Sequence, residues 1–281
     1  MRVLLIGKNG QLGHELARSL PAVMEEVVAT DRAQLELTDL DAVRRKVRDV
    51  RPNLIINASA YNAVDRAEDE SRLAMAVNAV APGVLAEEAK RLDALLVHYS
   101  TDYVFDGGKR TPYVEEDAPA PLSAYGASKL AGERAVQASG SRHLVLRTSW
   151  VYGPRANNFY AVVKRKAAAG EPMRMVDDQT SVPTSASFLA ATTVALLKKD
   201  CAGLMHLVPS GSATRYDFAR AIVRLSGSRA AVASARSTDF PSAARRPTYS
   251  VMSNGLASAF LGRALPGWEA QLEDVMTRPA G

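Results

Sequence analysis

Apolar residues along the first 150 positions follow two alternating periods. Short runs rich in Val, Ile and Leu predict five β-strands, at residues 2–7, 25–30, 53–59, 94–100 and 143–149. Between these runs, helical spacing of apolar residues predicts helices at residues 11–20, 40–50, 65–91 and 123–139, with Pro82 as a candidate break in the third. Strands that alternate with helices in this way favour an α/β fold with a Rossmann-like, doubly wound parallel sheet covered on both faces.

The pattern becomes less regular after Trp150. Helices are expected near residues 157–169, 184–199 and 214–226, with a short strand at 204–208 and linkers rich in Pro, Ser and Arg. We therefore expect a main domain at 1–150 and a smaller α+β lobe at 151–281, which lies over the carboxyl edge of the sheet. Some later segments are expected to return to the main domain.

Composition narrows the class of protein. The 281 residues are 47% hydrophobic and contain no apolar run long enough to span a bilayer. The amino-terminal run ends too early, at Gly7, for a signal peptide, and with the single Cys201 this predicts a cytoplasmic protein without disulfides. The net charge of +5 suits anionic ligands. Because the basic residues are scattered and aromatic residues make up only 6%, we expect no nucleic-acid or membrane partner.

A glycine motif lies between the first strand and the first helix. Gly7, Gly10 and Gly13 form GxxGxxG, which would let a diphosphate approach the amino end of the helix. A plain strand-to-helix turn would also use glycines. Asp31 ends the second strand about 20 residues further on, where an acid binds the adenosine ribose of a dinucleotide. The adjacent Arg32 could accept a 2′-phosphate, so NADPH and NADH both remain candidates.

Polar residues follow the fourth strand. Thr101 and Asp102 would emerge at the carboxyl edge of the sheet, where open α/β sheets bind ligands, although such residues also commonly end strands. A Thr hydroxyl there can hydrogen bond to a carbonyl oxygen that gains negative charge. His98 is expected to pack within the strand. The histidines are isolated and no metal-ligand spacing is present, so we predict no metal site.

Tyr125 and Lys129 form a YxxxK motif on the helix that Ser123 can cap. At this spacing the two side chains share one face, which is compatible with a catalytic pair or with an ordinary solvated face. The glycine turn, the Thr after the fourth strand and YxxxK on the next helix together resemble the short-chain dehydrogenase/reductase family. This resemblance implies that Tyr125 exchanges a proton with the substrate, and that Lys129 holds the nicotinamide ribose and lowers the pKa of Tyr125.

Longer stretches resemble one branch of that family, the dTDP-4-dehydrorhamnose reductases. They are "GKNGQLGHEL", "NASAYNAVDRAE", "HYSTDYVFDG", "YGASKLAGE", "RTSWVYG" and "NNF". By position, the resemblance implies a set of cofactor contacts and a set of sugar contacts. The cofactor set is Gly7, Gly10, Gln11, Leu12, Asp31, Asp39, Leu40, Ala60, Tyr61, Tyr125 and Lys129. The sugar set is Thr101, Asp102, Tyr103 and Trp150, and the catalytic set is Tyr125, Lys129, Thr101 and Asp102.

The chain departs from that family's pattern in the predicted lobe. It reads "RRPTYSVMSNGL" where the family usually has "RPxNSRL", and Arg215 stands where an aromatic residue is usual. Some relatives bridge dimers with a metal. Glu15 could take part, but Ser187 stands where an acid would be wanted, so we keep the prediction of no metal and expect a monomer or a homodimer.

The implied activity is NAD(P)H-dependent reduction of the C4 keto group of a dTDP-linked 4-keto-6-deoxy sugar, dTDP-4-dehydro-L-rhamnose. Two alternatives stay open at this point. One is another nucleotide-sugar ketoreductase or an epimerase on the same scaffold. The other is a non-catalytic subunit similar to the regulatory β subunit of methionine adenosyltransferase.

Overall fold

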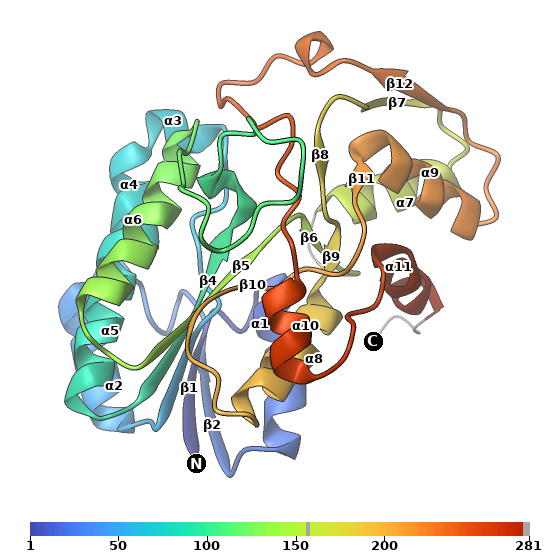
Figure 1. Ribbon diagram of the computed structural model, residues 1–281. Coiled ribbons are helices and arrows are strands. Elements are labelled where there is room, and N and C mark those ends of the chain that lie inside the picture. The colour runs from blue at the N-terminus through green and yellow to red at the C-terminus, as the bar shows by residue number, and fades with distance from the viewer. Residues whose placement is uncertain (156–157, 278–281) are drawn as a thin grey trace.

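A six-stranded parallel sheet forms the centre of the protein, as seen in the computed structural model, which describes residues 1–155 and 158–277 (Figure 1). The strand order is β10-β5-β4-β3-β1-β2. The strands are β1 (Arg2–Ile6), β2 (Glu26–Thr30), β3 (Leu54–Asn57), β4 (Leu95–Thr101), β5 (His143–Thr148) and β10 (Gly203–His206). The predicted Rossmann-like α/β fold is confirmed, and β10 comes from the second half of the chain.

Helices cover both faces of this sheet, as expected for strands whose residues are buried on both sides. One face carries α1 (Gln11–Ser19), α8 (Ala186–Leu197) and α10 (Gly255–Leu261), and the other carries α2 (Leu40–Val50), α5 (Ala81–Arg91) and α6 (Ala124–Ala138). Asp39, which with Thr38 is one of two capping residues before the helix, caps α2 by accepting from the Ala42 N–H. Ser123 caps α6 by accepting from the Gly126 N–H, as its sequence predicts.

The long helix expected at 65–91 is instead divided. It consists of α3 (Arg66–Asp69), α4 (Ser71–Met75), the π-helical turn η2 (Ala76–Val80) and α5. Pro82 lies in the first turn of α5 and does not end the helix. Because Pro82 has no N–H, the Asn78 carbonyl four residues earlier loses its usual donor, and the chain widens into the π turn just before the proline.

The smaller lobe packs beyond the carboxyl edge of the sheet (Figure 1). Its helices are α7 (Phe159–Ala168), α9 (Arg215–Leu225) and α11 (Trp268–Thr277). Its short strands pair as β6 (Val151–Tyr152) with β9 (Thr184–Ser185), β7 (Met173–Val176) with β12 (Val232–Ala235), and β8 (Thr180–Ser181) with β11 (Ala213–Thr214). Aromatic side chains, among them Tyr152, Tyr160, Phe218 and Trp268, fill its core.

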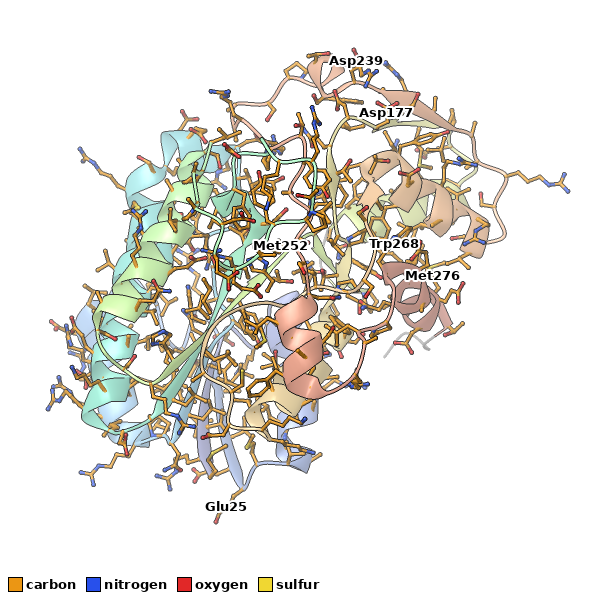
Figure 2. The ribbon with its side chains drawn as sticks, viewed as in Figure 1. Glu25, Asp177, Asp239, Met252, Trp268 and Met276 are labelled. Atoms are coloured by element: carbon orange, nitrogen blue, oxygen red, sulfur yellow. The ribbon has the colours of Figure 1, made fainter. Side chains whose placement is uncertain are left out.

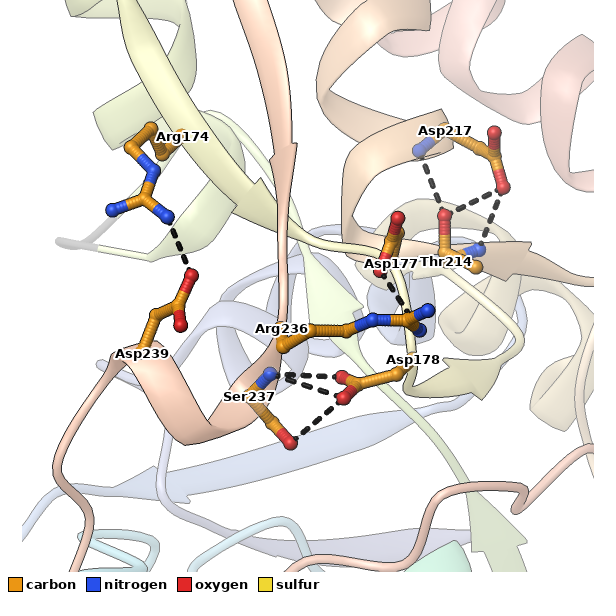
Figure 3. A network of polar contacts seen from close by, with 8 residues as sticks. All are labelled: Arg174, Asp177, Asp178, Thr214, Asp217, Arg236, Ser237 and Asp239. Atoms are coloured by element: carbon orange, nitrogen blue, oxygen red, sulfur yellow. Dashed lines mark hydrogen bonds and ion pairs between the residues drawn. The ribbon is translucent and has the colours of Figure 1, made fainter.

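Short 3-10 turns complete the described structure. They are η1 (Leu20–Ala22), η3 (Asp102–Val104) and η4 (Ser237–Asp239). Polar contacts hold η4 against the end of β7 in Figure 3: Arg174 bonds to Asp239, Asp178 accepts from Ser237, and Arg236 pairs with Asp177. These contacts fix the point from which the chain returns toward the main domain.

Residues 240–252, which we call the strap, run from η4 back across the sheet's carboxyl edge. Asp65 accepts hydrogen bonds from the Ser242 hydroxyl and the Ala244 N–H, and it pairs with Arg246 at 2.7 Å. The strap ends at Met252, which pairs with Tyr113 and lies between the sheet and the lobe in Figure 2. This strap lies within the Ser/Arg-rich stretch and the unusual "RRPTYSVM" motif of the sequence.

No helix within residues 1–155 and 158–277 has both the length and the apolar composition needed to cross a bilayer.

Candidate functional site

The glycine turn forms a close backbone cradle at the amino end of α1. Gly7 has a φ of 93°, and a Cβ there would lie 2.5 Å from the Ser59 hydroxyl. A Cβ on Gly13 would lie 2.0 Å from the Gly7 carbonyl oxygen, so neither position accepts a side chain. Gly10 precedes α1 and gives it no side-chain cap. The helix amino terminus therefore presents backbone N–H groups to a space that suits a diphosphate.

Two residues that follow the turn have separate roles. The Leu12 side chain is buried in the core, so only its backbone can meet a ligand. Gln11 accepts from the Asn158 amide at 2.8 Å and donates to the Val151 carbonyl at 3.4 Å. Gln11 therefore links the glycine turn to the start of the lobe.

Asp31 lies beside the glycine turn after β2. Its carboxylate accepts from the Asn9 amide at 3.1 Å and lies 3.6 Å from the Lys8 ammonium. Arg32 points outward and pairs with Glu36. The Asp31 carboxylate thus lies where a ribose could meet it. The sequence indicated only Arg32 as a cation near this carboxylate, and the structure adds Lys8.

The loop after β3 carries the next two predicted cofactor contacts. Ala60 is exposed, and Tyr61 donates from its phenol to Glu70 at 2.6 Å. The hydrogen bond to Glu70 raises the pKa of Tyr61. Asn78 of the π turn accepts from the Tyr61 N–H and donates both to the Tyr61 carbonyl and to the Ser128 hydroxyl of α6. Sequence analysis did not identify this residue, which joins the loop to the YxxxK helix.

The carboxyl end of β4 holds a buried carboxylate. Asp102 accepts from the Thr101 hydroxyl at 3.2 Å, from Ser181 of β8 at 2.8 Å and from Ser250 of the strap at 2.5 Å. Burial raises its pKa, and the three hydroxyl donors lower it in part. Asp102 therefore joins the main domain, the lobe and the strap at one point, and its oxygens already have donors from the protein.

The amino end of α6 packs directly on that point. A Cβ on Gly126 would lie 2.3 Å from the Tyr103 carbonyl oxygen, so the helix approaches η3 closely. This contact brings the ring of Tyr125 to 6.0 Å from the ring of Tyr103, edge to face. Burial raises the pKa of Tyr125, and interaction with the Thr101 hydroxyl lowers it. Tyr125 and Thr101 thus come together from elements that are distant in sequence.

Lys129 is buried beneath the same edge and does not lie on a solvated helix face. Lys129 is only 2% exposed, and its Nζ lies 3.4 Å from Nε2 of His98. Burial lowers the pKa of Lys129 to about 8, against the influence of Glu133. Burial and the Thr101 hydroxyl are the two largest influences on the pKa of Tyr125 in this structure, and the lowering expected from Lys129 stays a prediction.

An arginine covers the predicted sugar contact Trp150. The guanidinium carbon of Arg215 lies 3.6 Å from the centre of the Trp150 ring and 4.9 Å from that of Phe159. Trp150 itself has a φ of 41°, a left-handed conformation that is rare for a bulky residue and that often accompanies a functional site. Arg215, which replaces the aromatic residue usual in the family, therefore lies inside the site.

Two guanidinium groups act on Tyr103. Arg215 and Arg246 both influence its phenol electrostatically, and each lowers a pKa that burial raises. Burial and the proximity of Arg246 lower the pKa of Arg215. Asp65 is bonded to Arg246, and Asp102 interacts electrostatically with Arg215, so each guanidinium has a carboxyl group nearby.

The site residues at the strand ends and on the YxxxK helix follow from the sequence pattern, but those of the lobe and the strap do not. Arg246 was visible only as part of the unusual "RRP" stretch, and Asp65 carried no signal of its own. Asn157 of the "NNF" motif lies outside the described residues. Among residues 1–155 and 158–277, no group of three or more His, Cys, Asp or Glu side chains is placed to hold a metal ion.

Known proteins resemble this chain over nearly its whole length. The family model described as "RmlD substrate binding domain" matches residues 1–280. The dTDP-4-dehydrorhamnose reductase of Escherichia coli K12 is 39% identical, over 98% of this chain and 97% of the relative. The enzyme of the same name from Burkholderia thailandensis is 42% identical, over 95% of each chain. The solved dTDP-4-dehydrorhamnose reductase of Bacillus anthracis, in complex with NADP, has a TM-score of 0.93 at 34% identity and covers 98% of both chains.

Proposed function

The chain belongs to the family of dTDP-4-dehydrorhamnose reductases and is an NAD(P)H-dependent oxidoreductase, and from this premise we propose its substrate and its proton donor. The protein reduces the C4 keto group of dTDP-4-dehydro-L-rhamnose, which is dTDP-4-keto-6-deoxy-L-mannose, to give dTDP-L-rhamnose. Tyr125 donates the proton. The observation that carries this proposal is the meeting of Tyr125 and Thr101 at the carboxyl end of β4, above the buried Lys129.

The cradle at the amino end of α1 suits the diphosphate of a dinucleotide, because the close contacts at Gly7 and Gly13 allow a tight turn that leaves the first N–H groups of the helix facing outward. When bound, NADPH or NADH supplies the hydride. The backbone N–H groups of Gly10, Gln11 and Leu12 would hold the diphosphate, and Asp31 lies where it can accept from an adenosine ribose. The backbone around Asp39 and Leu40 and the Ala60–Tyr61 loop would enclose the rest of the nucleotide.

The state of Tyr125 suits proton donation. Because burial raises its pKa, the phenol keeps its proton at neutral pH and can give it to an alkoxide as C4 is reduced. The Thr101 hydroxyl, which interacts with that phenol, can orient the keto oxygen. Donation toward a developing alkoxide is the direction that a reductase requires.

The lobe side of the site suits a nucleotide sugar. Arg215 and Arg246 both lie near Tyr103, and because Arg246 is already paired with Asp65, Arg215 is the cation that we assign to the diphosphate. Trp150 offers an aromatic surface next to these charges, on which a sugar ring can pack. The same arrangement gives Arg215 a direct part in substrate binding in place of the usual aromatic residue.

The test is to supply dTDP-4-keto-6-deoxy-L-mannose with NADPH or NADH, follow the fall in nicotinamide absorbance and identify the product. Net oxidation of the nucleotide separates a reductase from an epimerase, which would consume none. Tyr125→Phe is expected to lower kcat about 10²–10⁴-fold and to leave NADPH affinity within about threefold, since it removes only the transferable proton. The matched variant Tyr216→Phe, on α9, should keep full turnover. Near-parental turnover by Tyr125→Phe would contradict the assignment of the proton donor.

A further inference from the structure

Three polar side chains form a buried row beneath Tyr125. Asn57 at the end of β3, His98 in the middle of β4 and Lys129 on α6 are 1%, 0% and 2% exposed. The family resemblance implies a role for Lys129 but none for the other two. Burying a polar side chain costs free energy unless it is hydrogen bonded, so the arrangement of this row requires a physical reason.

The orientation of Asn57 follows from a backbone contact. The Ser59 N–H donates to Oδ1 of Asn57 at 3.2 Å, so the Nδ2 group is the one that faces His98. Nδ2 lies 3.2 Å from Nδ1 of His98. An amide N–H requires an acceptor, and Nδ1 of His98 therefore carries no hydrogen.

The protonation of the His98 ring determines whether its Nε2 donates a hydrogen bond to Lys129 or accepts one from it. Burial holds the pKa of His98 well below its usual value, and a positive charge on Lys129 lowers that pKa further, so the ring is neutral whichever form Lys129 takes. A neutral ring that accepts at Nδ1 bears its hydrogen on Nε2, and Nε2 is the atom 3.4 Å from Nζ of Lys129. An N–H group directed at Nζ can donate to the lone pair of an uncharged amine. An ammonium group has no lone pair to accept this hydrogen, and its own hydrogens repel it.

The other ionisable groups near Lys129 do not reverse this preference. Glu133 lies one helical turn further along α6, and its two oxygens are bonded to Arg147 of β5 at 2.9 and 2.7 Å. Tyr125, one turn earlier, keeps its proton because burial raises its pKa. Among the residues that the structure describes, no carboxylate oxygen lies within 4 Å of the Lys129 Nζ.

We propose that His98, oriented by Asn57, is a positioning residue that holds Nζ of Lys129 beneath the site and favours its uncharged amine until a ligand brings oxygen acceptors to it. This inference rests on the proposed function and on the role that the family resemblance implies for Lys129, which is to hold the nicotinamide ribose through its hydroxyl groups. Above about pH 8, where much of the resting Lys129 is uncharged, binding would then be accompanied by uptake of a proton from solvent, which converts the amine to ammonium. His98 is no route for that proton, because the row ends at an amide that cannot carry one.

The first test reads the unliganded protein. Nitrogen NMR of the protein labelled with ¹⁵N-histidine distinguishes the two neutral ring forms, and His98→Gln assigns the His98 signals among the four histidines. We expect a neutral ring with its hydrogen on Nε2 throughout pH 6–9. A hydrogen on Nδ1, or a ring that titrates near its ordinary pKa, would overturn the proposal whether or not the protein reduces a sugar.

The second test measures the proton. Calorimetric titration with NADPH at pH 8.5, in two buffers of different ionisation heat, should show uptake of roughly three-quarters of a proton per site, since Lys129 has a pKa of about 8 at rest. Asn57→Asp places an acceptor beside Nδ1, turns the lone pair of Nε2 toward Nζ and should reduce the uptake by at least half.

Two further variants separate His98 from added charge. Asn57→Leu removes the amide donor without adding a charge, frees the ring to carry its hydrogen on Nδ1 and to turn the lone pair of Nε2 toward Nζ, and should also reduce the uptake. Asn53→Asp adds the same charge at the other end of β3 and should leave the uptake unchanged. Equal uptake in the parent, Asn57→Asp and Asn57→Leu would overturn the proposal. If a variant fails to fold, the ring form measured in the parent still decides it.

Discussion

Burial sets the charge of the ionisable groups at the carboxyl end of β4. It raises the pKa of Tyr125 and of Asp102, and it lowers the pKa of Lys129 to about 8. Each shift favours the neutral form, because removing a charged group from water is costly. A family resemblance could place these residues together, but it could not show how deeply each of them is buried.

The buried lysine is expected to cost stability. Its pKa is about 8 in the folded protein and near 10.4 in an unfolded chain, so between these values the unfolded chain holds a proton that the folded chain lacks. Stability therefore rises with pH through that window. Lys129→Met should increase the free energy of unfolding at pH 7 by about 2 kcal/mol, and this gain should shrink toward pH 10.

Urea unfolding at pH 7, 8.5 and 10 measures this effect. The partly exposed Lys46 of α2 provides the control, and Lys46→Met should change stability by less than about 0.5 kcal/mol at each pH. A Lys129→Met protein that is less stable than its parent at pH 7 would contradict the prediction.

At the scale of elements, the position of α6 determines where the YxxxK pair lies. A Cβ on Gly132 would lie 2.0 Å from the carbonyl oxygen of Asn78, so α6 packs directly against the π turn. Glu133 and Arg147 join α6 to β5 through two hydrogen bonds, with side chains 2% and 3% exposed. Pro82 leaves the Asn78 carbonyl without its usual helical donor. The helix that carries Tyr125 and Lys129 packs on that same carbonyl.

Breaking the ion pair between α6 and β5 should be costly. Glu133→Ala leaves the Arg147 guanidinium buried without its carboxylate and is expected to lower the free energy of unfolding by ~3–5 kcal/mol. The double variant Glu133→Leu/Arg147→Met replaces both charges with apolar groups of similar size and should recover most of that loss. Urea unfolding of the two variants measures both values, and a double variant as unstable as Glu133→Ala would contradict the explanation.

At the scale of the whole molecule, the second half of the chain completes the central sheet and the core of the first half. β10 is the edge strand beside β5, and α8 and α10 cover one face of the sheet. Leu189 and Val194 of α8 and Leu261 of α10 belong to the same buried cluster as Leu16 and Val97. The main core is therefore built from both halves, although a boundary near residue 150 follows the change of pattern in the sequence.

A fragment of residues 1–150 is accordingly expected not to fold alone. It would expose the apolar face that α8 and α10 cover and would leave β5 as an unpaired edge. Thermal unfolding followed by circular dichroism should show a cooperative transition for the full chain and none for the fragment. A cooperative transition of the fragment would show that the first half holds a sufficient core of its own.

The sequence by itself determined the alternation of strands and helices, the glycine turn, the caps of α2 and α6 and the YxxxK helix. These features are local: each depends on hydrophobic period, on a capping side chain or on a backbone that only glycine can adopt. Only the tertiary structure decided that Ser181 and Ser250 meet Asp102, that Arg215 stacks on Trp150 and that His98 faces Lys129. Those contacts join segments that are far apart in the chain, and the charge of each group depends on burial, which only the folded neighbours of a residue determine.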